Sequence, residues 1–158
     1  MDRYAGWGLA VSGLKPKLKR RSERQPLTRS QMMARISSRD TEPELFVRAA
    51  VSVLGYRYRV DVRSLPGAPD LANKSGGWAI YVHGCFWHQH PGCSLASSPR
   101  SNRAYWSRKL GGNVKRDATN LVHLESLGFR VLVLWECECR RIEPCLSKLN
   151  AFFAPLKG

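Results

Sequence analysis

Five of the nine histidines and cysteines in this sequence, residue types that can bind metals or transfer protons, lie within eleven residues: His83-Gly-Cys-Phe-Trp-His-Gln-His-Pro-Gly-Cys93. This segment holds three histidines, two cysteines and two adjacent aromatic rings, and it follows a short apolar run at residues 78–82. Nitrogen and sulfur ligands favour zinc, whereas carboxylate oxygens favour magnesium. The sequence therefore predicts two neighbouring sites, one suited to each metal.

The zinc site is predicted from ligand spacing. Within the segment the pattern is C-x4-H-x2-C, and a fourth ligand from a distant thiolate leaves no open position, as in structural zinc sites. The predicted set is Cys85, His90, Cys93 and Cys137. Cys139 is an alternative to Cys137, because both lie on the same face of an extended segment. The competing interpretation is that these are ordinary buried thiols and a surface imidazole, and Cys145 is expected in the core.

The magnesium site is centred on Asp70, which ends the proline-bounded turn Leu65-Pro-Gly-Ala-Pro-Asp70. A hairpin would bring this carboxylate near the strand end that leads to His83. A carboxylate and a histidine together hold Mg²⁺ and orient a water for attack on a phosphodiester, and His88 and Asp117 are available nearby. The simpler interpretations are a plain turn for Asp70 and an exposed helix position for Asp117.

Large rings accompany these ligands. Phe86 and Trp87 follow a tight turn and cannot both enter one core, and Trp106 lies in a basic neighbourhood. Adjacent rings on a rigid loop suit insertion between base pairs. The alternative is that one ring of the pair belongs to the core.

The elements that position these residues form an α/β pattern. The spacing Thr41-Glu-Pro-Glu44 predicts a capping box, which is also the simplest role for Glu44. The helix that follows is expected to end at Gly55. Its apolar residues form one stripe of Leu45, Ala49 and Val53 and a second stripe beside it of Phe46, Ala50 and Leu54. Another short helix is expected from Ser30. The remaining expected elements are a strand at 56–62, a hairpin of 70–72 and 78–82, helices at 104–110 and 114–127, a buried strand at 129–135, and a final helix with Pro144 in its first turn. Gly111-Gly112 is expected to separate the two middle helices. The order predicts a mixed central sheet flanked by helices.

The composition indicates which class of partner the protein binds. The chain has 158 residues, 26 Lys+Arg against 12 Asp+Glu, a net charge of +14 and a pI near 10.2, which favours a polyanionic partner. No apolar run is long enough to span a bilayer and no signal peptide is apparent. Five cysteines, an odd number, indicate reduced thiols. We therefore expect a cytoplasmic nucleic-acid-binding protein, with a basic flexible arm at 1–27 and one domain at 28–158.

Several motifs in order resemble the very-short-patch repair (Vsr-type) endonucleases of bacteria. They are Thr28-Arg-Ser-x-x-Met33 with Arg39-Asp-Thr41, Leu65-Pro-Gly-x-Pro-Asp70, His83-Gly-Cys-Phe-Trp-His88, Asn113-Val-x-Arg-Asp117, and Leu127-Gly128 through Trp135-Glu-Cys137. The resemblance covers roughly residues 27–140. It implies a variant of the restriction-endonuclease core with catalytic Mg²⁺ and structural Zn²⁺. It also implies nicking of double-stranded DNA 5′ of the thymine in T·G mismatches left by 5-methylcytosine deamination.

The resemblance also implies roles for individual residues. Asp70 would bind Mg²⁺ with the carbonyl of Val82, His88 would handle the attacking water, and His83, Asp117 and Glu44 would support them. The zinc ligands would be those predicted above. The implied DNA contacts are Met33, Phe86, Trp87, Trp106, Lys109 and Asn113. The resemblance also implies that the protein acts as a monomer on nucleoid DNA, beside mismatch-repair proteins.

Two departures from the family pattern concern the metal sites. Pro91-Gly92 adds one residue between His90 and Cys93, and Val82 stands where a threonine can occur. Two rival functions remain open. One is a restriction or defence nuclease that cuts perfectly paired DNA, and the other is a zinc-stabilised DNA-binding module without catalysis.

Overall fold

The computed structural model describes residues 39–156. In chain order, its elements are α2 (Glu42–Val53), β1 (Arg59–Val60), β2 (Leu71–Asn73), β3 (Trp78–His83), η1 (Ser94–Ala96), α3 (Arg103–Ser126), β4 (Arg130–Trp135), α4 (Glu136–Cys139), α5 (Ile142–Phe153) and η2 (Ala154–Leu156). The predicted arm at 1–27, the helix from Ser30 and Met33 lie outside the described residues. No helix within residues 39–156 is both long and apolar enough to cross a bilayer.

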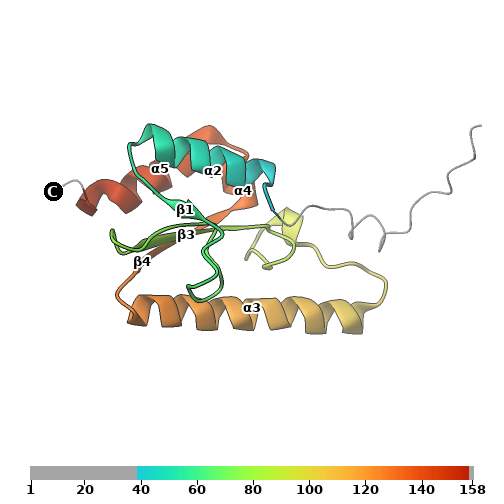
Figure 1. The fold of residues 1–158 in the computed structure, drawn as a ribbon. Helices are drawn as coiled ribbons and strands as arrows, with labels where there is room; N and C mark the ends of the chain where they lie inside the picture. Colours follow the sequence, from blue (N-terminus) through green and yellow to red (C-terminus); the bar gives the residue numbers. More distant parts are fainter. Residues whose placement is uncertain (1–38, 157–158) are drawn as a thin grey trace, which may run out of the picture. The chain divides into compact units, whose positions relative to one another are not determined.

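The four strands form one mixed sheet in the order β1-β2-β3-β4. The first three are antiparallel neighbours, and β4 pairs with β3 in parallel, with Ile80 opposite Leu132. A parallel pair needs a crossover, and α3 supplies it. Figure 1 shows α2, α4 and α5 on one face of the sheet and α3 on the other. The predicted α/β class with a mixed, helix-flanked sheet is therefore confirmed.

The core has two parts because β3 presents alternate residues to the two faces of the sheet. Trp78 and Ile80 pack with residues of α2 and α5, whereas Ala79 and Tyr81 pack with Leu124 of α3. The end of β3 is thus fixed from both faces. His83, its last residue, is buried there.

The buried face of α2 differs from the prediction. Leu45, Ala49 and Val53 are exposed, and the helix instead buries Val47, Ala50 and Val51. Leu54 and Phe46, which belong to the second predicted stripe, pack at the edge of the core. The helix does end before Gly55, whose φ of +85° suits a glycine after a helix. The strand predicted at 56–62 is wrong in extent, because only Arg59 and Val60 pair with β2.

The two helices predicted at 104–110 and 114–127 are one helix, α3, which runs through Gly111-Gly112. Each glycine costs about 1 kcal/mol relative to alanine in a helix interior. An unbroken inward face offsets this cost: Leu110 and Leu124 are buried, and between them Asn113 and Asp117 also face inward, half-buried. Val114 and Ala118, which an apolar inward face for a helix at 114–127 would include, are exposed. The apolar periodicity predicted two helices instead of one because polar residues occupy the middle of the buried face of α3.

Candidate active site and metal-binding cluster

The turn that leads to Asp70 is held by two other elements. The Tyr81 hydroxyl of β3 donates a hydrogen bond to the carbonyl of Pro66. Gly67 has φ = +69°, and a Cβ at this position would lie 2.7 Å from Nδ2 of Asn120 on α3. The turn is therefore fitted between β3 and α3. This packing positions Asp70 immediately before β2, beside the end of β3.

The Asp70 carboxylate is held against the backbone of β3. Its Oδ2 accepts a hydrogen bond of 2.7 Å from the N–H of Val82. The pKa of Asp70 is raised from 3.8 to about 6, chiefly by burial; the hydrogen bond from Val82 and the charge of Arg48 lower it, while the charge of Glu44 raises it. The carboxylate is therefore fixed in position but poorly solvated. A cation would relieve that desolvation, which fits the predicted magnesium ligand.

Three predicted catalytic side chains meet beside this carboxylate. The rings of His83 and His88 stack at 3.9 Å between centroids, with an interplanar angle of 9°. His88 Nδ1 donates to Oδ2 of Asp117 at 2.6 Å, so its Nε2 faces away from Asp117. The ligand atoms of all three residues lie within 4.8 Å of one another. Burial and the neighbouring His88 lower the pKa of His83 to about 4, which keeps this imidazole neutral near neutral pH.

Asp70 and the histidine pair lie at the same end of the sheet. Asp70 is bonded to Val82, the residue before His83, and His83 stacks on His88. Tyr81 provides a second link: burial raises its pKa to about 12, and the charges of both Asp70 and Asp117 add to this effect. Both carboxylates are thus near one phenol. Asp70 therefore lies at the strand end that also carries the histidine pair.

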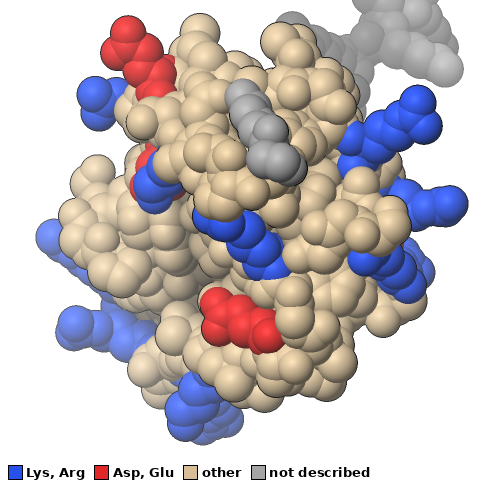
Figure 2. Space-filling model, turned by 90° about the vertical axis from the view of Figure 1, so that its left-hand side faces the viewer, with Lys and Arg blue, Asp and Glu red and all other residues tan. Residues whose placement is uncertain are grey.

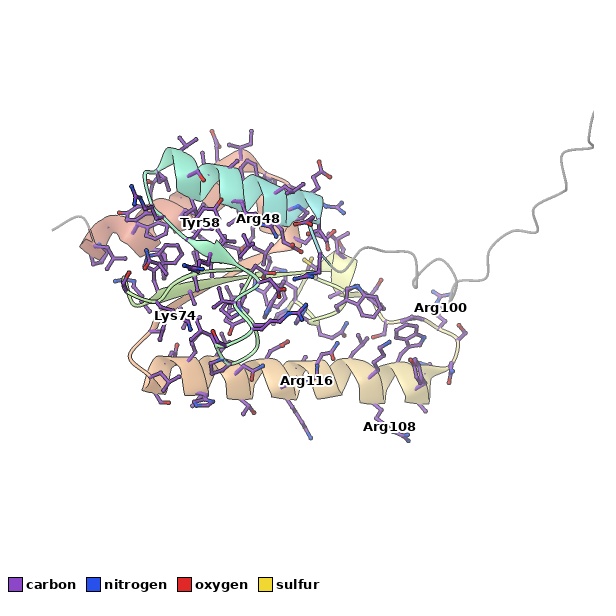
Figure 3. The ribbon with its side chains drawn as sticks, viewed as in Figure 1. Arg48, Tyr58, Lys74, Arg100, Arg108 and Arg116 are labelled. Carbon is purple, nitrogen blue, oxygen red and sulfur yellow. The ribbon has the colours of Figure 1, made fainter. Side chains whose placement is uncertain are left out.

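Glu44 lies nearby but is occupied by local contacts. Its buried carboxylate accepts hydrogen bonds from the N–H of Asp40 at 2.9 Å and from the Thr41 hydroxyl at 2.8 Å, and it pairs with Arg48 at 3.3 Å. The predicted capping box is therefore altered, because the Thr41 hydroxyl donates to Glu44 and caps no backbone N–H. Figure 3 labels Arg48 on α2. Sequence reasoning missed Arg48, although its i,i+4 spacing from Glu44 was a usable signal.

The four predicted zinc ligands form one cluster. The ligand atoms of Cys85, His90, Cys93 and Cys137 lie within 4.8 Å of one another. His90 Nδ1 is 3.6 Å from the sulfur of Cys85 and 3.3 Å from that of Cys137. Tetrahedral zinc places sulfur and nitrogen ligands about 3.5 Å apart. The donor types and their spacing therefore fit a structural zinc ion.

Cys137, rather than Cys139, reaches this cluster because the chain turns into α4 directly after β4. The Glu138 carboxylate accepts the N–H of Trp135 at 3.1 Å and so caps this short helix. The turn directs Cys139 into the core, where its sulfur lies 3.8 Å from that of Cys145. The extended conformation considered for residues 137–139 is wrong. Cys145 is a core residue, as expected.

Neighbouring side chains support this Cys/His cluster. Trp135 stacks on the ring of His90 at 4.2 Å, and Glu136 accepts the N–H of Cys85 at 3.3 Å. Burial raises the pKa of the Cys85 thiol to about 12. A bound metal would stabilise the thiolate that burial disfavours. Glu136 was missed by sequence reasoning, although it lies within the Trp-Glu-Cys motif.

The three predicted wedge rings form a half-exposed group that we name the aromatic cluster: Phe86, Trp87 and Trp106. Their centroids lie 5.0–6.2 Å apart. Asn113 donates to the Trp87 carbonyl at 3.1 Å, and Lys109 Nζ lies 5.3 Å from the Trp87 ring and 5.6 Å from that of Trp106. All these predicted DNA contacts are therefore adjacent. The loop also brings them next to His88.

Comparison with known proteins identifies the family. A family model described as DNA mismatch endonuclease Vsr matches residues 23–94. The chain is 41% identical over 113 residues to the DNA mismatch endonuclease Vsr of Escherichia coli, covering 72% of each protein. It is 39% identical to the type II nicking enzyme V.XorIIP of Xanthomonas oryzae pv. oryzae, covering 84% of this chain and 92% of that relative. It is 36% identical to V.NmeAIP of Neisseria meningitidis serogroup A, covering 82% and 91%. Together with the assembled site, these matches show that the chain is a DNA endonuclease that belongs to the Vsr family of mismatch-repair enzymes.

Proposed function

We propose that this endonuclease nicks double-stranded DNA on the 5′ side of the thymine in T·G mismatches and requires Mg²⁺ for the reaction. The mismatches would be those that deamination of 5-methylcytosine leaves. We also propose that its sheet and helices are a variant of the restriction-endonuclease core. The observation that carries the catalytic proposal is the row of contacts from Asp117 through His88 and His83 to the strand end that binds Asp70.

Each residue of this row has a distinct task. Asp117 accepts from Nδ1 of His88 and thereby fixes the ring, so that Nε2 is the nitrogen that receives a proton from water. His83 supports His88 through ring stacking and, being neutral, adds no charge beside it. A water molecule would thereby meet a base whose orientation is set before DNA binds.

Asp70 is the residue we propose for holding Mg²⁺, with the backbone carbonyl of Val82 as its partner. When bound, the ion would stabilise negative charge on the phosphate as the phosphodiester is hydrolysed. Because the proposed Val82 ligand is a carbonyl, the side chain that replaces threonine leaves it intact. Glu44 would contribute through its charge near Asp70 rather than as a ligand, since its oxygens are engaged by Asp40, Thr41 and Arg48.

We propose a structural zinc ion at Cys85, His90, Cys93 and Cys137. Phe86, Trp87 and His88 all lie between the first two of these ligands in the sequence. A metal bound there would hold the loop rigid, which an irregular segment without much buried apolar area needs. The role of zinc would be to position recognition and catalytic side chains rather than to react.

Recognition would come from the aromatic cluster inserting beside the mismatch. Insertion requires unstacking, and a wobble pair is easier to open than a Watson–Crick pair. Lys109 and Asn113 would meet the exposed base edges. The net charge of +14 would add attraction that is independent of sequence. Figure 2 shows Lys and Arg projecting around the end of the molecule that carries the last turn of α3, so this attraction is not confined to the site. We propose that the enzyme acts as a monomer on bacterial nucleoid DNA, beside mismatch-repair proteins.

A nicking assay tests the proposal. Duplexes that differ only in one T·G or T·A pair, labelled on the thymine strand, are incubated with and without Mg²⁺. We expect wild-type protein to cut 5′ of the thymine in the T·G duplex only. Asp70→Ala and His88→Ala should lose at least about 100-fold in rate. Glu125→Gln, which removes an exposed carboxylate from α3, is the matched control and should cut normally.

Other outcomes would support the rival functions. Equal cutting of T·G and T·A duplexes would indicate a restriction or defence nuclease, and binding without Mg²⁺-dependent cutting would indicate a DNA-binding module. Normal cutting by Asp70→Ala and His88→Ala would remove the active-site assignment.

A further inference from the structure

Tyr105, in the first turn of α3, adds a fourth ring to the aromatic cluster. Its side chain is 49% exposed and packs edge-on against Trp106 at 5.3 Å and 79°. The structure gives this large ring no place in either core group. An exposed ring beside an already exposed cluster enlarges an apolar surface, which in a nucleic-acid-binding protein points to contact with the ligand.

Tyr105 also holds the side chain of Lys109. The two residues are four positions apart on α3, so they share a helix face. Lys109 Nζ lies 5.7 Å from the Tyr105 ring centroid and donates a hydrogen bond of 3.4 Å to the Tyr105 hydroxyl. The same ammonium lies over Trp87 and Trp106. Among these three rings, Tyr105 is the only one that also offers an oxygen acceptor.

The cationic side chains around Lys109 make its contacts with the rings important for its position. Arg103 and Arg108 lie on the same turns of α3, and Arg100 lies in the loop before it; Arg108 projects on the side away from the sheet (Figure 3). Repulsion from these cations favours a Lys109 side chain that extends into solvent. The three ring faces and the phenol oxygen oppose this, because cations are attracted to ring faces. Lys109 is therefore held beside the rings before any ligand arrives.

A lysine ammonium held in this position can distinguish base pairs. It donates to guanine O6 and N7 and to thymine O4, which are all acceptors on the major-groove edge. In a T·A pair, the N6 amino donor of adenine stands in place of guanine O6 and offers the ammonium no acceptor. An ammonium fixed beside inserted rings would therefore favour T·G over T·A. A freely moving ammonium would favour it less.

We propose that Tyr105 is a positioning residue for mismatch discrimination: its ring and hydroxyl hold the Lys109 ammonium against Trp87 and Trp106, so that the ammonium meets the base edges as the rings insert. This inference rests on the proposed T·G specificity. It assigns a role to a residue that neither the motif pattern nor the predicted DNA contacts included.

The test compares Tyr105→Phe and Tyr105→Leu with wild-type protein in binding and nicking of T·G and T·A duplexes. Fluorescence anisotropy without Mg²⁺ measures the ratio of the two affinities. We expect this T·G to T·A ratio to fall about 3-fold for phenylalanine, which keeps the ring, and about 10-fold for leucine. Thermal unfolding temperatures should stay within about 2 °C of wild type, because Tyr105 is exposed. Val122→Ala, which removes another exposed apolar side chain of α3, should leave the ratio unchanged.

A double-variant comparison separates positioning from independent contact. If Tyr105 acts through Lys109, then Tyr105→Leu combined with Lys109→Ala should lower the ratio no further than Lys109→Ala alone. The inference is overturned if Tyr105→Leu keeps the wild-type ratio, or if the two effects multiply. A wild-type protein that does not distinguish T·G from T·A refutes the proposed function and this inference together. A discriminating wild type with an unaltered Tyr105→Leu variant refutes the inference alone.

Discussion

Replacing Gly67 by alanine tests whether the turn before Asp70 is held as tightly as the structure indicates. Gly67 has φ = +69°, and a Cβ at this position would lie 2.7 Å from Nδ2 and 3.0 Å from Cβ of Asn120. A left-handed conformation costs an L-residue about 1–2 kcal/mol. Overpacking typically costs about 1–3 kcal/mol. We expect Gly67→Ala to lower the free energy of unfolding by about 2–5 kcal/mol, the sum of the two costs.

Two comparisons separate these costs. Gly128 has φ = +82° and nothing within 4 Å of a Cβ, so Gly128→Ala should lose only the backbone part, about 1–2 kcal/mol. Asn120→Ala removes the obstructing amide. When Asn120→Ala is added to Gly67→Ala, the free energy of unfolding should be about 1–2 kcal/mol higher than the sum of the two single-variant effects predicts. Urea unfolding followed by tryptophan fluorescence measures all of these proteins.

The same variants report on the site. If the turn shifts to accommodate alanine, Asp70 moves with it, so nicking by Gly67→Ala should fall even at temperatures where the protein is fully folded. Gly128→Ala should cut normally under those conditions. The reasoning fails if Gly67→Ala costs no more stability than Gly128→Ala, or if Asn120→Ala brings no recovery.

Three further predictions concern the carboxylate, the metal cluster and the core. Because the folded-state pKa of Asp70 is raised from 3.8 to about 6, the folded protein binds this proton more tightly; the associated stability is present below about pH 4 and is lost as pH rises through 6. Asp70→Asn has no charge to bury, so in Mg²⁺-free buffer it should be more stable than wild type at pH 8, by up to about 3 kcal/mol, and equal to it at pH 4, in urea unfolding. Cys137→Ser should lose bound zinc in elemental analysis and at least about 2 kcal/mol of stability, whereas Cys139→Ala should keep one equivalent; equal zinc content in both would contradict the ligand set. Leu149→Ala should cost about 2–5 kcal/mol in thermal unfolding, since Leu149 is fully buried, and a loss under 1 kcal/mol would contradict its place in the core.

The grouping of the candidate metal ligands was the part of the site that the sequence predicted best. Cysteines and histidines at zinc spacing have few other reasons to cluster, so Cys85, His90 and Cys93 could be grouped before their geometry was known. The choice between Cys137 and Cys139 required the structure, because it depends on the chain entering α4 directly after β4. Glu138 provides the helix cap that causes this turn, and its effect was not recognised in the sequence.

Helix faces were predicted less well, for a physical reason. The inward face of α3 includes Asn113 and Asp117, which bond to the Trp87 carbonyl and to His88. Polar residues that serve a site replace the apolar ones on which periodicity depends, so a continuous helix resembles two short ones separated by glycines. In α2 the buried Glu44 has the same effect, because it occupies a core-facing position with its charge compensated by Arg48.

The polar residues on the inward face of α3 also connect the proposed recognition residues to the proposed catalytic residues. Phe86, Trp87 and His88 are consecutive, so whatever fixes one constrains the others. From one side they are held by the cluster of Cys85, His90, Cys93 and Cys137. From the other, α3 gives each a partner: Trp106 contacts the rings and Asp117 orients His88. In the function we propose, one loop carries both tasks and one helix supports both, so a displacement of the rings by correctly paired DNA would also displace His88, the proposed base. Specificity would then be exerted at the chemical step as well as in binding.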